Sequence, residues 1–282
     1  MPNVHIIGGE KGGVGKSTFA KSLVEYLLYY MIPFIAIDTD RSAPDLSRAF
    51  EGSEVEIREA FLSESEDYQS AAQPIVLSAM EKTTVVNLSA ASFEALSKWI
   101  AEDEVFEIIS DCGIKFFLWF VSDGSVDSVN PFKKSLQTYG KDIQHILVRN
   151  EGRNRAKDWR LIDADEEIQS LMKSCNVLQI DFSKFVNNDT FNVVRDNSLS
   201  FSGAIELQKE LGLNVFHVQQ LKSFLRKTRE AIDTLGLFED LKPTESKQAQ
   251  IELQQLTSVE AAEPTTNKKS KKSPAKAGAA KQ

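Results

Sequence analysis

One short segment near the N-terminus constrains the fold of this 282-residue chain more than any other. Val4–Ile7 is a short apolar run typical of a buried strand, and Lys16–Met31 carries Phe19, Leu23 and Leu27 at the spacing of one helix face. The glycine-rich sequence EKGGVGKST joins the two. A strand, a glycine-rich turn and a helix in this order predict a loop that surrounds a phosphate group.

The residue types in this loop suit phosphate binding. Glycines let the backbone turn tightly and direct its N–H groups at an anion, and the helix that begins at Lys16 adds the positive end of its dipole. The Lys16 ammonium is expected to reach the β- and γ-phosphates, the Ser17 hydroxyl to bind Mg²⁺, and Thr18 to contact the α-phosphate. The nucleotide-binding residues predicted here are Gly12, Gly13, Val14, Gly15, Lys16, Ser17 and Thr18.

The loop departs from the general pattern G-x-x-x-x-G-K-[ST] at its first position, where Glu10 replaces glycine and Lys11 follows. K-G-G-x-G-K-[ST] is the deviant Walker A motif, and in it the chain resembles the ParA/MinD family of ATPases. The resemblance implies ATP and Mg²⁺ as ligands, and an ATP-bound homodimer in which Lys11 reaches the nucleotide of the partner chain. A second cation there could offset charge on the transferred phosphoryl group. The alternative is that Lys11 is a solvated loop lysine.

Acidic residues follow two apolar runs, where the carboxyl ends of parallel strands line a ligand crevice. After Phe34–Ile37, the resemblance makes Asp40 the candidate for orienting the attacking water, and Asp38 would hold either the Mg²⁺ shell or the loop. Asp111 follows a predicted strand at Val105–Ile109 and matches the Walker B position, where it would bind Mg²⁺ through water. The alternative for Asp38 and Asp40 is a pair of ordinary loop carboxylates.

Asn150 ends a later apolar run, Ile143–Val148. An amide both donates and accepts hydrogen bonds, and the resemblance assigns Asn150 to recognition of the adenine edge. Asn87 also follows two valines, but its place within the run indicates a structural role. The catalytic set that the resemblance implies consists of Lys11, Lys16 and Asp40.

Short apolar runs alternate with helical patterns along the chain. Within most of these runs the residues are apolar throughout, rather than apolar and polar in turn. This pattern is typical of parallel strands buried on both faces, so it predicts a doubly wound α/β fold with a mainly parallel sheet flanked by helices, as in P-loop NTPases. The predicted strands are Val4–Ile7, Phe34–Ile37, Thr84–Leu88, Val105–Ile109, Phe116–Val121, Ile143–Val148 and Val177–Ile180. The predicted helices are Lys16–Met31, Ser92–Ala101, Val126–Tyr139, Ile162–Ser174, Gly203–Leu211 and Phe216–Leu235.

The ATPase domain is expected to cover residues 1–238, and residues 239–282 are predicted to form a disordered tail, because they are too polar to bury a core. The last 19 residues, from Pro264, hold six lysines and no acid. Subtracting these six charges from the net charge of −8 leaves −14 on the remainder. The tail and the last helix, with Lys222, Arg226, Lys227 and Arg229, are predicted to bind DNA nonspecifically. The alternative is a tail that only solubilises.

Composition excludes several other classes. Cys112 and Cys175 are far apart, so a zinc site or an iron–sulfur cluster within one chain is not expected. The three histidines lie on apolar segments and are expected to pack rather than to bind a metal. A cytoplasmic location fits the cysteine usage and the lack of a signal peptide pattern. After Leu256 the sequence has no apolar helix face, which argues against binding to a membrane.

The sequence therefore predicts an ATP-dependent dimerisation switch that acts in partition of plasmid or chromosomal DNA or in cargo positioning, with slow hydrolysis and an activating partner protein. One alternative is a nucleotide-binding regulator of a conjugal transfer or mobilisation complex, since residues 108–113 and 148–152 resemble that branch of the family. The other is a metabolic P-loop enzyme, for which no second substrate motif is visible.

Overall fold

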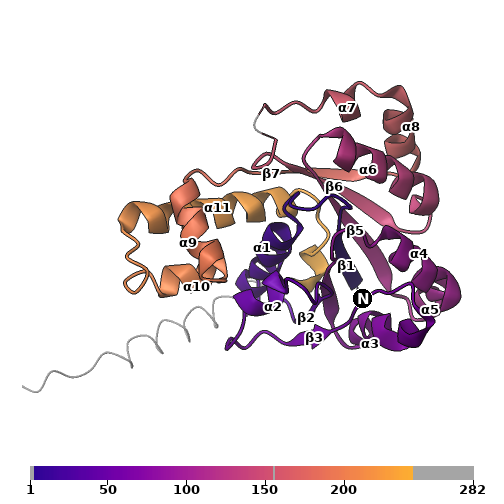
Figure 1. The fold of residues 1–282 in the computed structure, drawn as a ribbon, viewed down its shortest axis with the longest axis horizontal. Coiled ribbons are helices and arrows are strands. Elements are labelled where there is room, and N and C mark those ends of the chain that lie inside the picture. The colour runs from indigo at the N-terminus through magenta and orange to yellow at the C-terminus, as the bar shows by residue number, and fades with distance from the viewer. Residues whose placement is uncertain (1–2, 155, 244–282) are drawn as a thin grey trace, which may run out of the picture. The chain divides into compact units, whose positions relative to one another are not determined.

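The computed structural model describes residues 3–154 and 156–243. Their central feature is a sheet of seven parallel strands in the order β3-β2-β4-β1-β5-β6-β7 (Figure 1). The strands are β1 (Asn3–Gly8), β2 (Phe34–Asp38), β3 (Ile57–Glu59), β4 (Thr83–Asn87), β5 (Lys115–Ser122), β6 (Gln144–Asn150) and β7 (Leu178–Phe182). Because all strands run the same way, their carboxyl ends meet at one edge of the sheet, and the loop after β1 lies there.

Helices cover both faces of the sheet, as expected for strands that are buried on both sides. The helices are α1 (Lys16–Tyr29), α2 (Asp45–Ala49), α3 (Pro74–Glu81), α4 (Phe93–Glu102), α5 (Val105–Asp111), α6 (Val126–Tyr139), α7 (Arg160–Asp163), α8 (Glu166–Ser174), α9 (Asn188–Asp196), α10 (Phe201–Glu206) and α11 (Val215–Asp233). Two short 3₁₀ segments lie at Glu66–Ala72 and Glu239–Leu241.

Two apolar cores separate the layers. Residues of α1, α2, α9, α10 and α11 pack on one face, and residues of α3 to α8 pack on the other (Figure 1). Neighbouring strand residues alternate between the cores: Ile6 belongs to the second and Ile7 to the first. The doubly wound α/β architecture that the sequence predicts is confirmed.

One predicted strand is wrong. Residues Val105–Asp111 form the helix α5, and the strand that pairs with β1 begins at Lys115. Val105 and Ile109 are its buried residues, one helical turn apart, while Asp111 is exposed. A short apolar run fits a helix and a strand equally well, so the pattern alone did not decide.

The other six predicted strands are present. The predicted helix Ile162–Ser174 is divided into α7 and α8, because Asp165 accepts a hydrogen bond from the Ile168 amide and starts a new helix. The sequence reading did not include β3, α2, α3 or α9. The predicted start of the tail at residue 239 is corrected, because Glu239–Leu241 form a 3₁₀ segment and Lys242 pairs with Asp233 at 2.8 Å. The rest of the predicted tail, from residue 244, lies outside the described residues. Within 3–154 and 156–243, no helix is both long enough and apolar enough to cross a membrane.

Candidate nucleotide-binding site

The loop between β1 and α1 has the backbone geometry that its glycines predict. Gly13 and Gly15 have φ values of 71° and 106°, which residues other than glycine rarely adopt. A Cβ at Gly15 would lie 2.3 Å from the side-chain nitrogen of Asn150. Glycine at position 15 is therefore required both by its backbone conformation and by its neighbour.

Asn150, at the end of β6, supports this loop. Its side-chain nitrogen donates to the Val14 carbonyl at 2.8 Å, and its side-chain oxygen accepts from the Gly152 amide at 2.9 Å. Asn150 is 4% exposed and Val14 is 1% exposed. The amide thus ties the loop after β1 to the end of β6, two strands away, and recognition of adenine by Asn150 stays a prediction.

Lys16 lies inside the loop. It is 8% exposed, and its ammonium donates to the Lys11 carbonyl at 3.4 Å. Burial lowers the pKa of Lys16, and the negative charges of Glu10 and Asp40 oppose this change. A buried ammonium surrounded by loop backbone is the arrangement that binds a phosphate chain.

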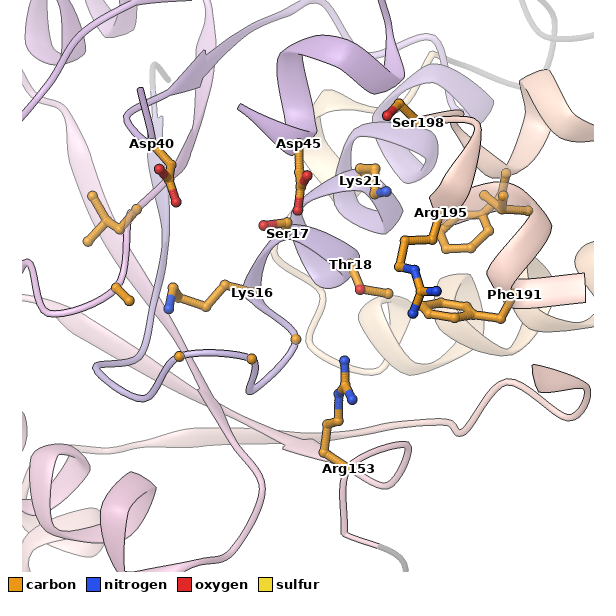
Figure 2. Close-up of a pocket in the computed structure, with 17 residues that line it drawn as sticks. Lys16, Ser17, Thr18, Lys21, Asp40, Asp45, Arg153, Phe191, Arg195 and Ser198 are labelled. Atoms are coloured by element: carbon orange, nitrogen blue, oxygen red, sulfur yellow. The ribbon is translucent and has the colours of Figure 1, made fainter. Parts of the chain in front are cut away.

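A cavity of about 330 Å³ opens above the loop (Figure 2). Its lining consists of Gly12, Gly13, Gly15, Lys16, Ser17, Thr18, Lys21, Asp40, Asp45, Leu88, Ala90, Arg153, Phe191, Val194, Arg195, Ser198 and Phe201. A second cavity of about 260 Å³ adjoins it on the side of Thr18 and Asn150. Together they are large enough for a nucleotide, with the phosphates at the loop and the nucleoside beyond Thr18.

Three oxygen-bearing side chains in this cavity fit a magnesium ion. Figure 2 shows Ser17 at the start of α1 with the carboxylates of Asp40 and Asp45 on the same side of the cavity. Hydroxyl and carboxylate oxygens are the ligands that Mg²⁺ takes together with phosphate oxygens and water. Among the described residues no group of three or more His, Cys, Asp or Glu side chains could hold a metal ion without further ligands.

Within the described part of the chain, Asp40 has one oxygen held by hydrogen bonds and the other without a donor. Its Oδ1 accepts from the Ser42 hydroxyl at 2.6 Å, the Ser42 amide at 3.1 Å and the Ala43 amide at 3.0 Å. Burial raises the pKa of Asp40, but these hydrogen bonds and the Lys16 charge outweigh it and leave the pKa below its ordinary value. Asp40 is therefore an ionised carboxylate in the cavity, held in place by its own loop.

Asp38 holds the loop that contains Asp40. Its Oδ2 accepts from the amides of Leu46 and Ser47 at 2.9 and 3.1 Å, at the start of α2. Its Oδ1 accepts from the Asn87 side chain at 3.0 Å and the Asp40 amide at 3.3 Å. Both oxygens are thus engaged, and Asp38 does not line the cavity. The sequence left two roles open for Asp38, and these contacts favour the loop; its metal role stays a prediction.

Asp111 is not at this site. It ends α5, four residues before β5 begins, and β5 runs parallel to β1 with Lys115 opposite Asn3. Asp111 therefore lies near the amino ends of the strands, whereas the phosphate loop follows their carboxyl ends. The prediction that Asp111 binds Mg²⁺ is corrected, because it rested on a strand that is a helix.

Asp123 is the acid that does follow β5, and it binds Lys11. The Lys11 ammonium lies 2.6 Å from Asp123 Oδ2 and 3.0 Å from the Ser125 hydroxyl. Lys11 lines neither cavity of its own chain. The Lys11 side chain is thus held by Asp123 and Ser125 of its own chain, outside both cavities.

The sequence profile of the CobQ/CobB/MinD/ParA nucleotide-binding domain matches residues 5–251. The chain belongs to this family. It is also 26% identical over 157 residues to the protein TraL of Escherichia coli, an alignment that covers 53% of this chain and 64% of TraL.

The sequence did not point to four side chains in or beside the site of this family member. They are Asp45, Asp123, Arg153 and Arg195. A signal existed for Asp123, because it follows the predicted strand Phe116–Val121. Asn87, for which the sequence predicts a structural role, donates to Asp38 at 3.0 Å. No pattern in the neighbouring sequence could have placed Arg195 at the site, because α9 comes close to the phosphate loop only in the folded chain.

Proposed function

We propose that this CobQ/CobB/MinD/ParA-family chain is an ATP-dependent dimerisation switch that hydrolyses ATP slowly. The placement of two lysines within one loop carries the proposal: Lys16 is buried inside the loop, while Lys11 is held outside both cavities. Lys16 would bind the phosphates of its own nucleotide. Lys11, once released from Asp123, would contact the nucleotide of a second copy of the chain, which makes dimerisation dependent on ATP.

Hydrolysis would require a water placed in line with the γ-phosphorus. The free oxygen of Asp40 can accept a hydrogen bond from such a water, because its other oxygen is fixed by Ser42 and Ala43. The water oxygen would bond to phosphorus, the bond to the β,γ-bridging oxygen would break, and the water proton would end on the released phosphate. A carboxylate with a lowered pKa suits orientation of the water better than retention of its proton.

Single-turnover hydrolysis tests this role. Asp40→Ala should bind MgATP normally and hydrolyse it at least about tenfold more slowly, a barrier change of ~1.4 kcal/mol. Asp127→Ala, in the exposed first turn of α6, is the matched control and should hydrolyse like wild type. Equal rates for wild type and Asp40→Ala would remove Asp40 from hydrolysis.

Nonspecific DNA is the partner proposed for the last helix and the tail. Lys222, Arg226 and Arg229 line a hollow on α11, where Arg226 pairs with Glu230 at 2.7 Å and Arg229 lies over the Tyr29 ring. The Lys-rich residues from 264 lie outside the described residues. Fluorescence anisotropy with duplex DNA should give an affinity that falls steeply as salt rises, and changing the six tail lysines to glutamine should reduce that salt dependence.

A role in conjugal transfer is the second candidate, and the similarity to TraL favours it. Since the chain spans only 64% of TraL, that similarity supports no more than a proposal. A plasmid with Lys16→Ala in this gene separates the two roles. Reduced inheritance of the plasmid with normal transfer would favour partition, whereas reduced transfer with normal inheritance would favour the transfer role.

A further inference from the structure

The two cavities adjoin at a passage lined by the residues they share. Thr18, Arg153, Phe191 and Arg195, with Gly15, belong to both linings. In Figure 2, Arg153 and Arg195 come from different segments, and both side chains extend toward the region around Thr18. A nucleotide with its phosphates in the loop must pass its α-phosphate and ribose through this passage.

The charge of the second cavity exceeds what a nucleoside needs. Its described lining contains three cationic side chains, Arg153, Lys184 and Arg195, and no carboxylate. Adenosine itself is uncharged, and the phosphates of ATP would already be bound by Lys16 and the N-terminus of α1. Arg153 and Arg195 also line the cavity at the loop, but Lys184 lines the second cavity alone. With Lys184 the positive charge extends beyond the 5′-phosphates, where an uncharged nucleoside gives it no partner and a ligand with a further negative charge would.

The cations are available for such a ligand. Arg153 is exposed, and among the described residues no ion pair or hydrogen bond of its side chain is found. Arg195 pairs with its neighbour Asp196 at 2.8 Å, but both side chains are about 60% exposed. An exposed pair of this kind contributes little and can open when a stronger anion arrives. Guanidinium groups bind phosphate through two parallel hydrogen bonds, which makes this anion their natural partner.

The rest of the second cavity suits a base. Phe182, Phe185 and Phe191 supply apolar surface, and Asn188 and Asn192 supply amide groups. The base would therefore occupy the apolar part, and the ribose would lie at the passage beside the two arginines. The ribose oxygens at the 2′ and 3′ positions are the points where a further phosphate could be attached.

We propose that this chain binds nucleotides that carry a phosphate on the ribose as well as at the 5′ position, with Arg153, Arg195 and Lys184 holding the ribose phosphate. The ligand class is a purine nucleoside 5′-diphosphate or triphosphate with a 2′- or 3′-phosphate. This inference rests on nucleotide binding at the loop, but it does not depend on hydrolysis or dimerisation. Such a nucleotide would compete with ATP, so it would control how often the switch is loaded.

Isothermal titration calorimetry in the presence of Mg²⁺ tests the inference. The probes are ADP, adenosine 3′-phosphate 5′-diphosphate and its 2′-phosphate isomer. Wild type should bind one of the two ribose-phosphorylated nucleotides at least about tenfold more tightly than ADP, a gain of ~1.4 kcal/mol. The double variant Arg153→Gln/Arg195→Gln should lose this preference, and Arg160→Gln, an exposed arginine outside both cavities, should keep it.

The remaining outcomes separate this inference from the proposed function. If wild type binds all three nucleotides equally, the ribose phosphate site does not exist, while nucleotide binding stands. If the double variant weakens ADP and both isomers by the same factor, the arginines contact only the 5′-phosphates, and the inference is overturned. If neither ADP nor ATP binds, the proposed function fails together with it.

Discussion

The ammonium of Lys11 lies 2.6 Å from Asp123, so the phosphate loop is tied to the segment that follows β5. Asp123 is itself fixed: its Oδ1 accepts from the hydroxyls of Ser125 and Ser128 at 2.6 and 2.8 Å. Burial raises the pKa of Asp123, but the hydrogen bonds from Lys11 and the two serines dominate and lower it to about 2. Asp123 is thus charged at neutral pH and holds Lys11 within its own chain.

Removing the charge of Asp123 should therefore favour dimerisation. In Asp123→Asn the Lys11 ammonium loses its ion pair and becomes available to a second chain, so the ATP-dependent dimer should form at lower protein concentration. Lys11→Ala should bind ATP normally and stay monomeric. Light scattering with MgATP measures both, and a normal dimer in Lys11→Ala would refute a role for this lysine between chains.

The same ion pair shows where sequence reasoning succeeds and where it stops. The loop residues and their neighbouring strand and helix follow from local pattern, because glycine spacing and helix periodicity are properties of adjacent residues. The partner of Lys11 is 112 residues away in sequence, and only the pairing of β5 with β1 brings them together. Contacts of this kind follow from sheet order, which the sequence did not give.

Asp111 and Asn87 show the same limit. An acid after an apolar run is expected to mark the metal-binding end of a strand, but Val105–Asp111 is the helix α5. The strand β4, which pairs with β1, ends in Asn87. Asn87 is 1% exposed, and its amide donates to Asp38. The sequence reading expected a structural role for Asn87 and placed it within the run, whereas it ends β4, next to the loop that carries Asp40.

Lys16→Ala should abolish nucleotide binding. The buried ammonium donates to the loop backbone at Lys11 and lines the cavity at the loop, so its loss removes a counter-charge of the phosphates. Calorimetry with ATP should show binding at least about 100-fold weaker, or ~2.7 kcal/mol. Lys98→Ala, on α4 and outside both cavities, is the control. Undiminished binding by Lys16→Ala would show that this loop is not the nucleotide site.

Gly15→Ala should disrupt the loop in two ways. The backbone at Gly15 has a φ of 106°, and the new Cβ would meet the Asn150 side chain at 2.3 Å. Gly113→Ala is a matched control, because its φ is 64° and no atom lies within 4 Å of the added Cβ. We expect both variants to lose stability through backbone strain, by about 1 kcal/mol. Only Gly15→Ala should also lose ATP binding, measured by calorimetry; equal ATP affinities would contradict the contact with Asn150.

Two buried histidines predict how stability depends on pH. His5 and His145 are each 0% exposed. Burial lowers the pKa of His5 to about 3 and that of His145 to about 4, although a hydrogen bond with the Ile143 carbonyl raises the latter in part. His5 accepts a hydrogen bond from Trp119 at 3.1 Å and stacks against Phe117. Both imidazoles are therefore neutral in the folded chain at pH 5 and above.

The unfolded chain takes up protons at these histidines below their ordinary pKa of about 6.5, whereas the folded chain does not. Its unfolding free energy should therefore fall as the pH decreases from 6.5 to 5, by up to about 1.4 kcal/mol per pH unit for each histidine. His5→Phe removes one of the two imidazoles that take up a proton on unfolding. It should be less stable than wild type at pH 7, because Trp119 loses its acceptor, but the difference should shrink toward pH 5. Urea unfolding at both pH values measures this, and parallel pH profiles would show that His5 is protonated in the folded chain.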